Sequence, residues 1–190
     1  MTTSTAIEQT INMTNGVDVG RIISMVEEIE EDPGYAQFQF RAANHWMSGG
    51  LNQSRIKEFF AGNAEDDTRS QAYLLKADEA AIAGGKDTAP TPVEYVLHAL
   101  ASCLTTTLVY HAAVNGIVVD AVDSSLTGDI DVRGVLGLRE DVRKSFRSVT
   151  VNMRVKSEAT VDELTELASY SPVYDLVSRS LPVELVIARY

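Results

Sequence analysis

A single cysteine, Cys103, is the side chain best suited to covalent chemistry in this chain of 190 residues. A cysteine thiolate is a strong nucleophile, and a peroxide oxidises it to a sulfenic acid. A free thiol ionises near pH 8.5, so a reactive Cys103 needs a cationic or hydrogen-bonding neighbour. The structural alternative is a small buried hydrophobe, because free cysteines are among the most buried residues. One cysteine forms no internal disulfide, which favours a reducing compartment.

The residues around Cys103 predict a long helix that begins at Thr91 and ends at Asn115. Thr91 and Glu94 have the spacing of a capping box, with Pro92 at the first helical position. The start of this helix is about 16 Å from Cys103, too far for the helix dipole to help the thiol ionise. Glu94 lies nine residues before Cys103, half a turn out of phase, which favours the cap over a catalytic role.

Other cofactor and metal chemistry has little support in the sequence. None of His45, His98 and His111 pairs at helical spacing with another metal-binding residue, so we expect no zinc site. Only His111 lies within about 80° of Cys103 on the helix. The glycine pairs Gly49-Gly50 and Gly84-Gly85 are typical of turns and do not form a nucleotide-binding fingerprint. We expect neither a metal nor a cofactor.

The remaining patterns predict an α+β fold, because strands occur in hairpin-linked runs between helices. We expect a flexible arm over residues 1–15 and a single domain over 16–190, with an N-terminal helix at 18–31 and the cysteine helix at 91–115. Alternating or apolar runs predict strands at 38–42, 56–60, 73–77, 117–122, 125–132, 146–156 and 183–188. Residues 61–70 and 78–90 are predicted to be loops. Thr160 is predicted to begin a helix, which Ser171-Pro172 ends. A short helix is predicted to follow at 173–178.

Composition narrows the class of partner. The formal net charge is −11, which disfavours nucleic acids and anionic membrane surfaces. The N-terminus lacks the basic start and apolar core of a signal peptide, and no apolar run is long enough for a membrane span. These features favour a cytoplasmic location.

Residues 91–105, with the sequence TPVEYVLHALASCLT, resemble the central helix of the OsmC/Ohr-like family. This family contains osmotically inducible protein C and the organic hydroperoxide resistance proteins. Further similarity lies in 41–46, 128–131, 134–137 and 171–173, and the resemblance covers residues 35–190. It implies an α+β fold with antiparallel sheets around two long central helices, and an intertwined homodimer with active sites at the subunit interface.

The resemblance also implies site residues. Cys103 matches the first cysteine of family peroxidases, which a hydroperoxide oxidises to a sulfenic acid. The second, resolving cysteine is replaced by Ser171, and Val93 and Leu51 stand where the hydroperoxide-resistance branch has its glutamate and arginine. Arg41 and Arg55 are the candidates to stabilise the thiolate instead.

Two functions follow as hypotheses. The first is a single-cysteine peroxidase that reduces organic hydroperoxides and is restored by an external thiol. The second is a non-catalytic protein that binds a small apolar ligand at the dimer interface, with Cys103 in the pocket wall. A protein-interaction role for the amphipathic helix at 19–31 is a third and weaker possibility, because such helices usually pack on the core.

Overall fold

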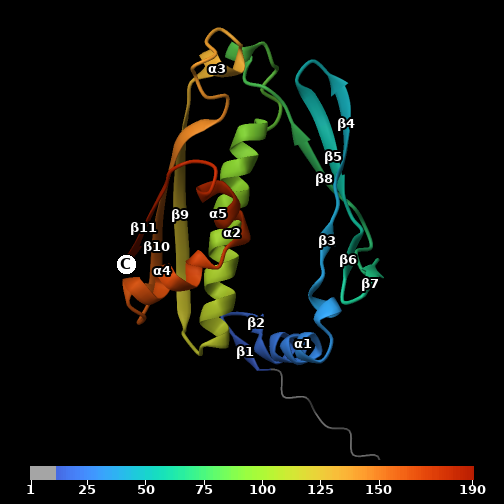
Figure 1. Ribbon diagram of the computed structural model, residues 1–190, viewed down its shortest axis with the longest axis vertical. Coiled ribbons are helices and arrows are strands. Elements are labelled where there is room, and N and C mark those ends of the chain that lie inside the picture. The colour runs from blue at the N-terminus through green and yellow to red at the C-terminus, as the bar shows by residue number, and fades with distance from the viewer. Residues whose placement is uncertain (1–11) are drawn as a thin grey trace, which may run out of the picture.

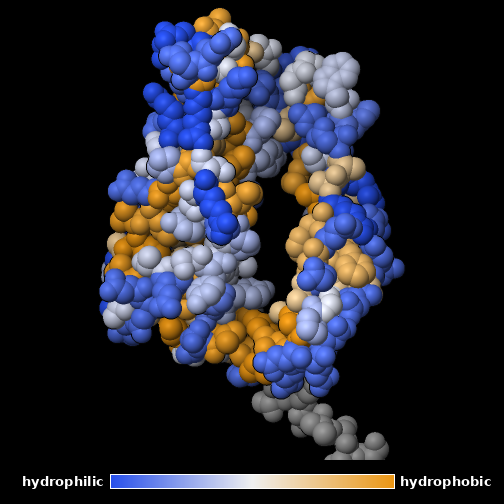
Figure 2. All heavy atoms as spheres, in the orientation of Figure 1, coloured by the Kyte–Doolittle hydropathy of each residue, from blue (hydrophilic) through white to orange (hydrophobic). Residues whose placement is uncertain are grey.

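The computed structural model describes residues 12–190, which fold into two lobes around an opening (Figures 1 and 2). In the larger lobe, the long helix α2 (Pro92–Val114) packs on a three-stranded sheet in the order β11–β10–β9. The strands of this sheet are β9 (Val119–Ile130), β10 (Phe146–Ser157) and β11 (Val183–Arg189). The short helices α3 (Val132–Val135), α4 (Val161–Ser169) and α5 (Pro172–Ser178) complete this lobe.

The smaller lobe consists of two small sheets. One has the order β4–β5–β8, with β4 at Ala43–Ser48, β5 at Leu51–Ile56 and β8 at Tyr73–Ala77. The other has the order β3–β6–β7, with β3 at Gln39–Phe40, β6 at Phe59–Ala61 and β7 at Ala64–Asp66. Helix α1 (Val19–Glu31), preceded by the paired strands β1 (Met13–Thr14) and β2 (Val17–Asp18), joins this lobe to the C-terminal end of α2 (Figure 1).

The core lies between α2 and β10. Leu100, Leu104 and Leu108 recur every four residues along α2 and are completely buried. They meet the alternate inward-facing residues of β10, namely Val149, Val151, Met153 and Val155. Within residues 12–190, α2 is the one helix long and apolar enough to cross a membrane. Its leucine stripe belongs to the core, whereas other apolar side chains of the same helix, among them Val93, Val96 and Val114, are exposed.

Local signals predicted most elements of the fold. Both capping boxes form, at Thr91 for α2 and at Thr160 for α4, and Asp18 caps α1. The Gly49-Gly50 turn joins β4 to β5, so the return strand is Leu51–Ile56 rather than 56–60. A second hairpin at Gly62-Asn63 pairs β6 with β7 inside the predicted loop 61–70. The two strands predicted at 117–132 are one continuous strand, β9, because β10 pairs along its whole length.

Two larger expectations are corrected. The sheets are not all antiparallel, since β11 pairs parallel to β10 through the crossover made by α4 and α5. Residues 12–190 also contain one long helix rather than two, because Ser171-Pro172 divides the C-terminal helical segment. Residues 1–11 of the expected arm lie outside the described residues. The following residues are docked: the Asn15 side chain donates to the Ile117 carbonyl and accepts from the Val119 amide, both at 2.9 Å.

The connector before α2 is held by a buried carboxylate. Asp78, which is 1% exposed, follows β8 and accepts from the hydroxyl and amide of Thr88 at 2.7 and 3.1 Å. It also accepts from the Glu79 amide at 2.8 Å. Gly85 is required in this loop, because an added Cβ would lie 1.8 Å from the Glu79 carbonyl oxygen. These contacts fix the chain just before the cap of α2.

The Asp78 carboxylate makes stability depend on pH. Its pKa is lowered chiefly by the Thr88 hydroxyl, and further by the Glu79 and Thr88 amides. Because the folded pKa is below the unfolded value of about 3.9, this stabilisation is present above about pH 4 and is lost as the pH falls through the folded pKa. We expect Asp78→Asn to lower the thermal unfolding midpoint strongly at about pH 6 and much less at about pH 3. The exposed neighbour variant Asp87→Asn is the control. If the difference in unfolding midpoint between the wild type and Asp78→Asn were the same at both pH values, the prediction would be contradicted.

Candidate functional site

Cys103 lies on a flank of α2 that the core leaves free. The thiol is unpaired and half-buried. Helical geometry places Val96, Tyr110 and Val114 within about 20° of Cys103, and Leu104 about 100° away. Those three residues are exposed, whereas Leu104 is completely buried. Cys103 therefore lies at the boundary between the core and an exposed apolar face of α2.

The two predicted thiolate-stabilising arginines lie in the smaller lobe. Arg41, between β3 and β4, donates to both carboxylate oxygens of Glu65 at 2.7 Å and to Gln39. Arg55, on β5, donates two hydrogen bonds to the Glu58 carboxylate, each at 3.0 Å. Figure 2 shows the opening that separates this lobe from the one that contains α2. A single chain thus brings neither arginine to Cys103, and each guanidinium is already neutralised by a carboxylate.

These contacts lower the pKa values of the two carboxyl groups and raise those of the two arginines. Hydrogen bonds from Arg55 lower the pKa of Glu58 to about 2, and Arg41 likewise lowers the pKa of Glu65. The same contacts raise the pKa values of both arginines. All four side chains therefore stay charged at neutral pH.

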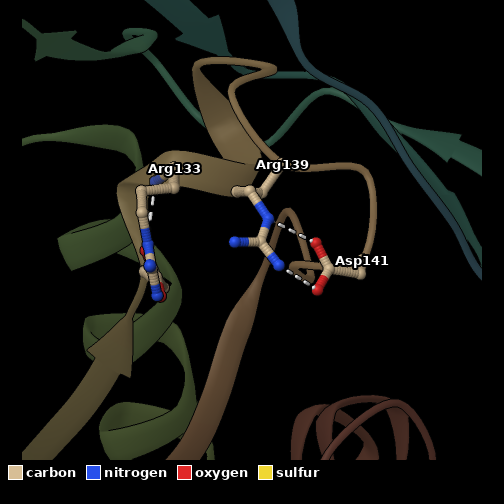
Figure 3. Close-up of polar contacts among 4 residues, drawn as sticks. Arg133, Arg139 and Asp141 are labelled. Carbon is tan, nitrogen blue, oxygen red and sulfur yellow. Dashed lines mark hydrogen bonds and ion pairs between the residues drawn. The ribbon is translucent and has the colours of Figure 1, made fainter.

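Other arginines are also paired with nearby carboxylates. In the loop between β9 and β10, Arg133 pairs with Asp131, and Arg139 forms two hydrogen bonds with Asp141 at 2.8 and 2.7 Å (Figure 3). Every ion pair found within residues 12–190 lies outside α2. No cluster of three or more metal-binding side chains occurs in the same part of the chain.

Glu94 has the geometry of a helix cap. Its carboxylate accepts from the Thr91 amide at 2.7 Å and from the Thr91 hydroxyl at 2.9 Å. The Thr91 amide, and then its hydroxyl, lower the pKa of Glu94. An ionised carboxylate in the first turn of α2 suits the helix dipole. These contacts hold Glu94 at the start of the helix.

Ser171 is the residue for which the family resemblance implies a second cysteine. It is 1% exposed and caps α5, where its hydroxyl accepts from the Tyr174 amide at 3.2 Å. Helix α2 contacts both α4 and α5, so Ser171 lies where the segments that pack on α2 meet. The serine therefore retains a structural role without a thiol.

This region contains one feature that was not predicted from the sequence. His111, the histidine nearest Cys103 in helical angle, stacks on the Tyr170 ring with centroids 4.5 Å apart and an interplanar angle of 14°. Its neighbours Tyr110 and Val114 form one wall of a groove, and α1 forms the other. The signal was present in the sequence, because Tyr110 and Val114 follow Cys103 by seven and eleven residues.

Comparison with solved structures agrees with this architecture. An OsmC-like protein from Mycoplasma pneumoniae has 11% identity and a TM-score of 0.60, over 80% of this chain and 96% of that one. An organic hydroperoxide resistance protein from Elizabethkingia anophelis has 13% identity and a TM-score of 0.56, over 82% and 99%. A protein of similar name from Legionella pneumophila has 14% identity and a TM-score of 0.53, over 80% and 98%. Identities this low establish the fold alone.

Fold and site together define an α+β protein with one thiol beside the exposed face of a capped central helix. The sequence profile of the family described as OsmC-like protein matches residues 84–186, more than half of the chain. The chain therefore belongs to the OsmC-like family, which confirms the resemblance seen in residues 91–105. No curated protein sequence matches it significantly.

Replacing Ser171 tests whether this position faces the thiol. We expect Ser171→Cys to form an intramolecular disulfide with Cys103 after treatment with an organic hydroperoxide. Loss of the cap costs about 1 kcal/mol, so the variant should still fold. Mass spectrometry of peptides under non-reducing conditions detects the link, and Ser178→Cys on the same helix is the control. An oxidised Cys103 without a disulfide link would show that the two positions are not in register.

Proposed function

We propose that this protein reduces organic hydroperoxides through Cys103. The observation that carries the proposal is a single half-buried thiol on the free flank of the capped central helix, inside the segment matched by the OsmC-like profile. Membership of a family that includes organic hydroperoxide resistance proteins supports it. The exposed apolar residues beside Cys103 favour an organic peroxide over hydrogen peroxide.

The reaction needs two steps. The Cys103 thiolate attacks the terminal peroxide oxygen, the O–O bond breaks, and the alkoxide leaves and takes a proton to give the alcohol and a sulfenic acid. Since Ser171 has no thiol to offer, two external thiols then act in turn. The first displaces water from the sulfenic acid to form a mixed disulfide, and the second releases Cys103 and leaves the reductant as its disulfide.

A second copy of the chain is proposed to complete the site. Several large apolar residues of the β4–β5–β8 sheet are exposed, with Trp46 at 67%, Tyr73 at 60% and Leu74 at 61%. Tyr73 and Leu74 are consecutive on β8, so both faces of this small sheet are uncovered. Soluble monomers rarely leave such apolar area in water. In an intertwined homodimer, this sheet would cover the exposed flank of α2 of the partner subunit. Arg41 or Arg55, from the copy that contributes the sheet, would then supply the cation to Cys103 of its partner.

Turnover with a matched variant tests the peroxidase function. Purified protein is mixed with cumene hydroperoxide and either dithiothreitol or a monothiol, and peroxide consumption is followed. We expect turnover by the wild type and loss of at least about 100-fold in Cys103→Ser, because serine is not oxidised by a peroxide. Thr106→Ser, on the same helix, should keep the activity. Equal consumption by the wild type and Cys103→Ser, or none by either, would refute the proposal.

The alternative is a non-catalytic protein that binds a small apolar ligand at the dimer interface. The observation that favours it is the commitment of Arg41 and Arg55 to Glu65 and Glu58, which leaves neither guanidinium free to stabilise a thiolate. In that case Cys103 would be alkylated slowly, at the rate of an ordinary half-buried thiol.

The homodimer has its own test. We expect sedimentation velocity at micromolar concentration to give twice the chain mass of 20.7 kDa. Leu74→Asp should shift the species toward the monomer, because it places a charge on the apolar sheet face. Leu138→Asp, in the exposed loop between β9 and β10, should leave the mass unchanged. A wild-type chain that sediments as a monomer would contradict the dimer.

A further inference from the structure

Arg69 differs from the other two arginines of the smaller lobe. It lies in the loop between β7 and β8 and has no ion pair within residues 12–190, whereas Arg41 and Arg55 are each paired with a carboxylate. Its guanidinium donates to the Lys57 carbonyl at 2.8 Å. That bond uses only part of the five N–H donors of a guanidinium and leaves its charge uncompensated.

Two aromatic rings hold Arg69 in place. Its guanidinium carbon is 4.7 Å from the ring centroid of Phe59, on β6, and 5.4 Å from that of Tyr73, at the start of β8. Phe59 is itself stacked on Phe40, with ring centroids 5.7 Å apart. A cation–π contact attracts the guanidinium without neutralising it. The half-buried Arg69 therefore holds a positive charge at the junction of the two small sheets.

This charge lies beside the surface that the proposed homodimer covers. Tyr73 is 60% exposed and belongs to the β4–β5–β8 sheet, which would pack on the exposed flank of α2 of the partner subunit. Lys76, three residues further along β8, is on the opposite face of the sheet from Tyr73. Packing removes water from Arg69, and a desolvated charge without a partner is unfavourable. The covered surface must therefore offer Arg69 an anion or a set of acceptors.

On the flank of α2, Cys103 is the side chain best able to become that anion. From Tyr95 to Val114, the helix contains no aspartate or glutamate. Glu94, at its start, is held by the Thr91 amide and hydroxyl. A thiol ionises at about pH 8.5, whereas a phenol ionises only at about pH 10. A thiolate at Cys103 is thus the negative charge that this flank can present to a partner subunit.

We propose that Arg69 supplies the positive charge to Cys103 of the partner subunit. This assignment rests on the proposed peroxidase and homodimer. It favours Arg69 over Arg41 and Arg55, because those two would first have to leave their carboxylates. The Arg69 guanidinium donates to the thiolate sulfur and favours the ionised form of the thiol. Arg69 stays charged throughout and takes no part in the proton transfers.

The pH dependence of Cys103 alkylation by iodoacetamide tests this assignment. We expect the alkylation rate of the wild-type dimer to reach half its maximum below the value of about pH 8.5 for a free thiol. Arg69→Gln should raise this midpoint by about one pH unit or more, because a neighbouring cation favours the thiolate. Arg69→Lys should restore part of the difference. Lys76→Gln, which removes a cation from the opposite face of the sheet, is the matched control.

Mixed dimers show whether the charge acts across the interface. A heterodimer of Arg69→Gln with Cys103→Ser contains one thiol, on the first chain, and one Arg69, on the second. In a two-fold dimer these two residues face each other, so we expect this thiol to have the wild-type midpoint and the heterodimer to have about half the wild-type peroxidase turnover. If the thiol of the heterodimer behaves as in the Arg69→Gln homodimer, the charge does not come from the partner subunit and the proposal is overturned.

Failure of this assignment is distinguishable from failure of the proposed function. A low wild-type midpoint that Arg69→Gln leaves unchanged, with turnover intact, overturns the assignment alone. A midpoint that moves with Arg41→Gln or Arg55→Gln but not with Arg69→Gln does the same. A wild-type midpoint equal to that of the chain unfolded in urea, without turnover, overturns the function as well. Arg69→Met keeps an apolar side chain against the two rings and replaces Arg69→Gln if that variant does not fold.

Discussion

Burial of the leucine stripe of α2 against β10 is the contact on which the rest of the structure depends. Leu100, Leu104 and Leu108 are completely inaccessible, and the residues they meet on β10 are also buried. A Leu→Ala change at such a site typically costs about 2–5 kcal/mol, a large share of the stability of a domain. Since this packing fixes the rotation of α2 about its axis, it also fixes which residues face away from the sheet. Cys103 is half-buried because it lies at the edge of that stripe.

The smaller lobe has the opposite character. Its strands carry exposed aromatic and aliphatic side chains, and Arg41 and Arg55 are paired with carboxylates of the same lobe. It contributes little to the core that α2 forms with β9, β10 and β11. The two lobes meet through the buried Asp78 connector at one end and through α1 at the other. In the proposed homodimer, a second copy would bury the exposed apolar side chains of this lobe. The same copy would complete the surroundings of Cys103.

Much of this could be predicted from the sequence where the determinants are local. The capping boxes at Thr91 and Thr160 and the Gly49-Gly50 turn each depend on residues only a few positions apart. The parallel pairing of β11 with β10 could not be predicted, because it depends on how α4 and α5 cross the sheet. For the site, the rotation of 100° per residue in an α-helix predicted that Cys103 lies beside the leucine stripe, and the capping-box spacing predicted that Glu94 caps the helix. The partners of Arg41 and Arg55 were not predictable, since Glu65 is 24 residues from Arg41 and meets it only through the pairing of β3, β6 and β7.

The central claim is that the native fold makes Cys103 a reactive thiol. The most direct measurement is the rate at which a stoichiometric amount of cumene hydroperoxide converts Cys103 to a sulfenic acid, trapped with dimedone and quantified by mass spectrometry. The rate is compared between the native protein and the same chain unfolded in urea at the same pH. We expect a dimedone adduct on Cys103 that forms at least about 100-fold faster in the native protein than in the unfolded chain, because the proposed reaction needs the folded surroundings of the thiol. Equal rates, or slower oxidation in the native state, would contradict it and leave Cys103 as a residue of the pocket wall.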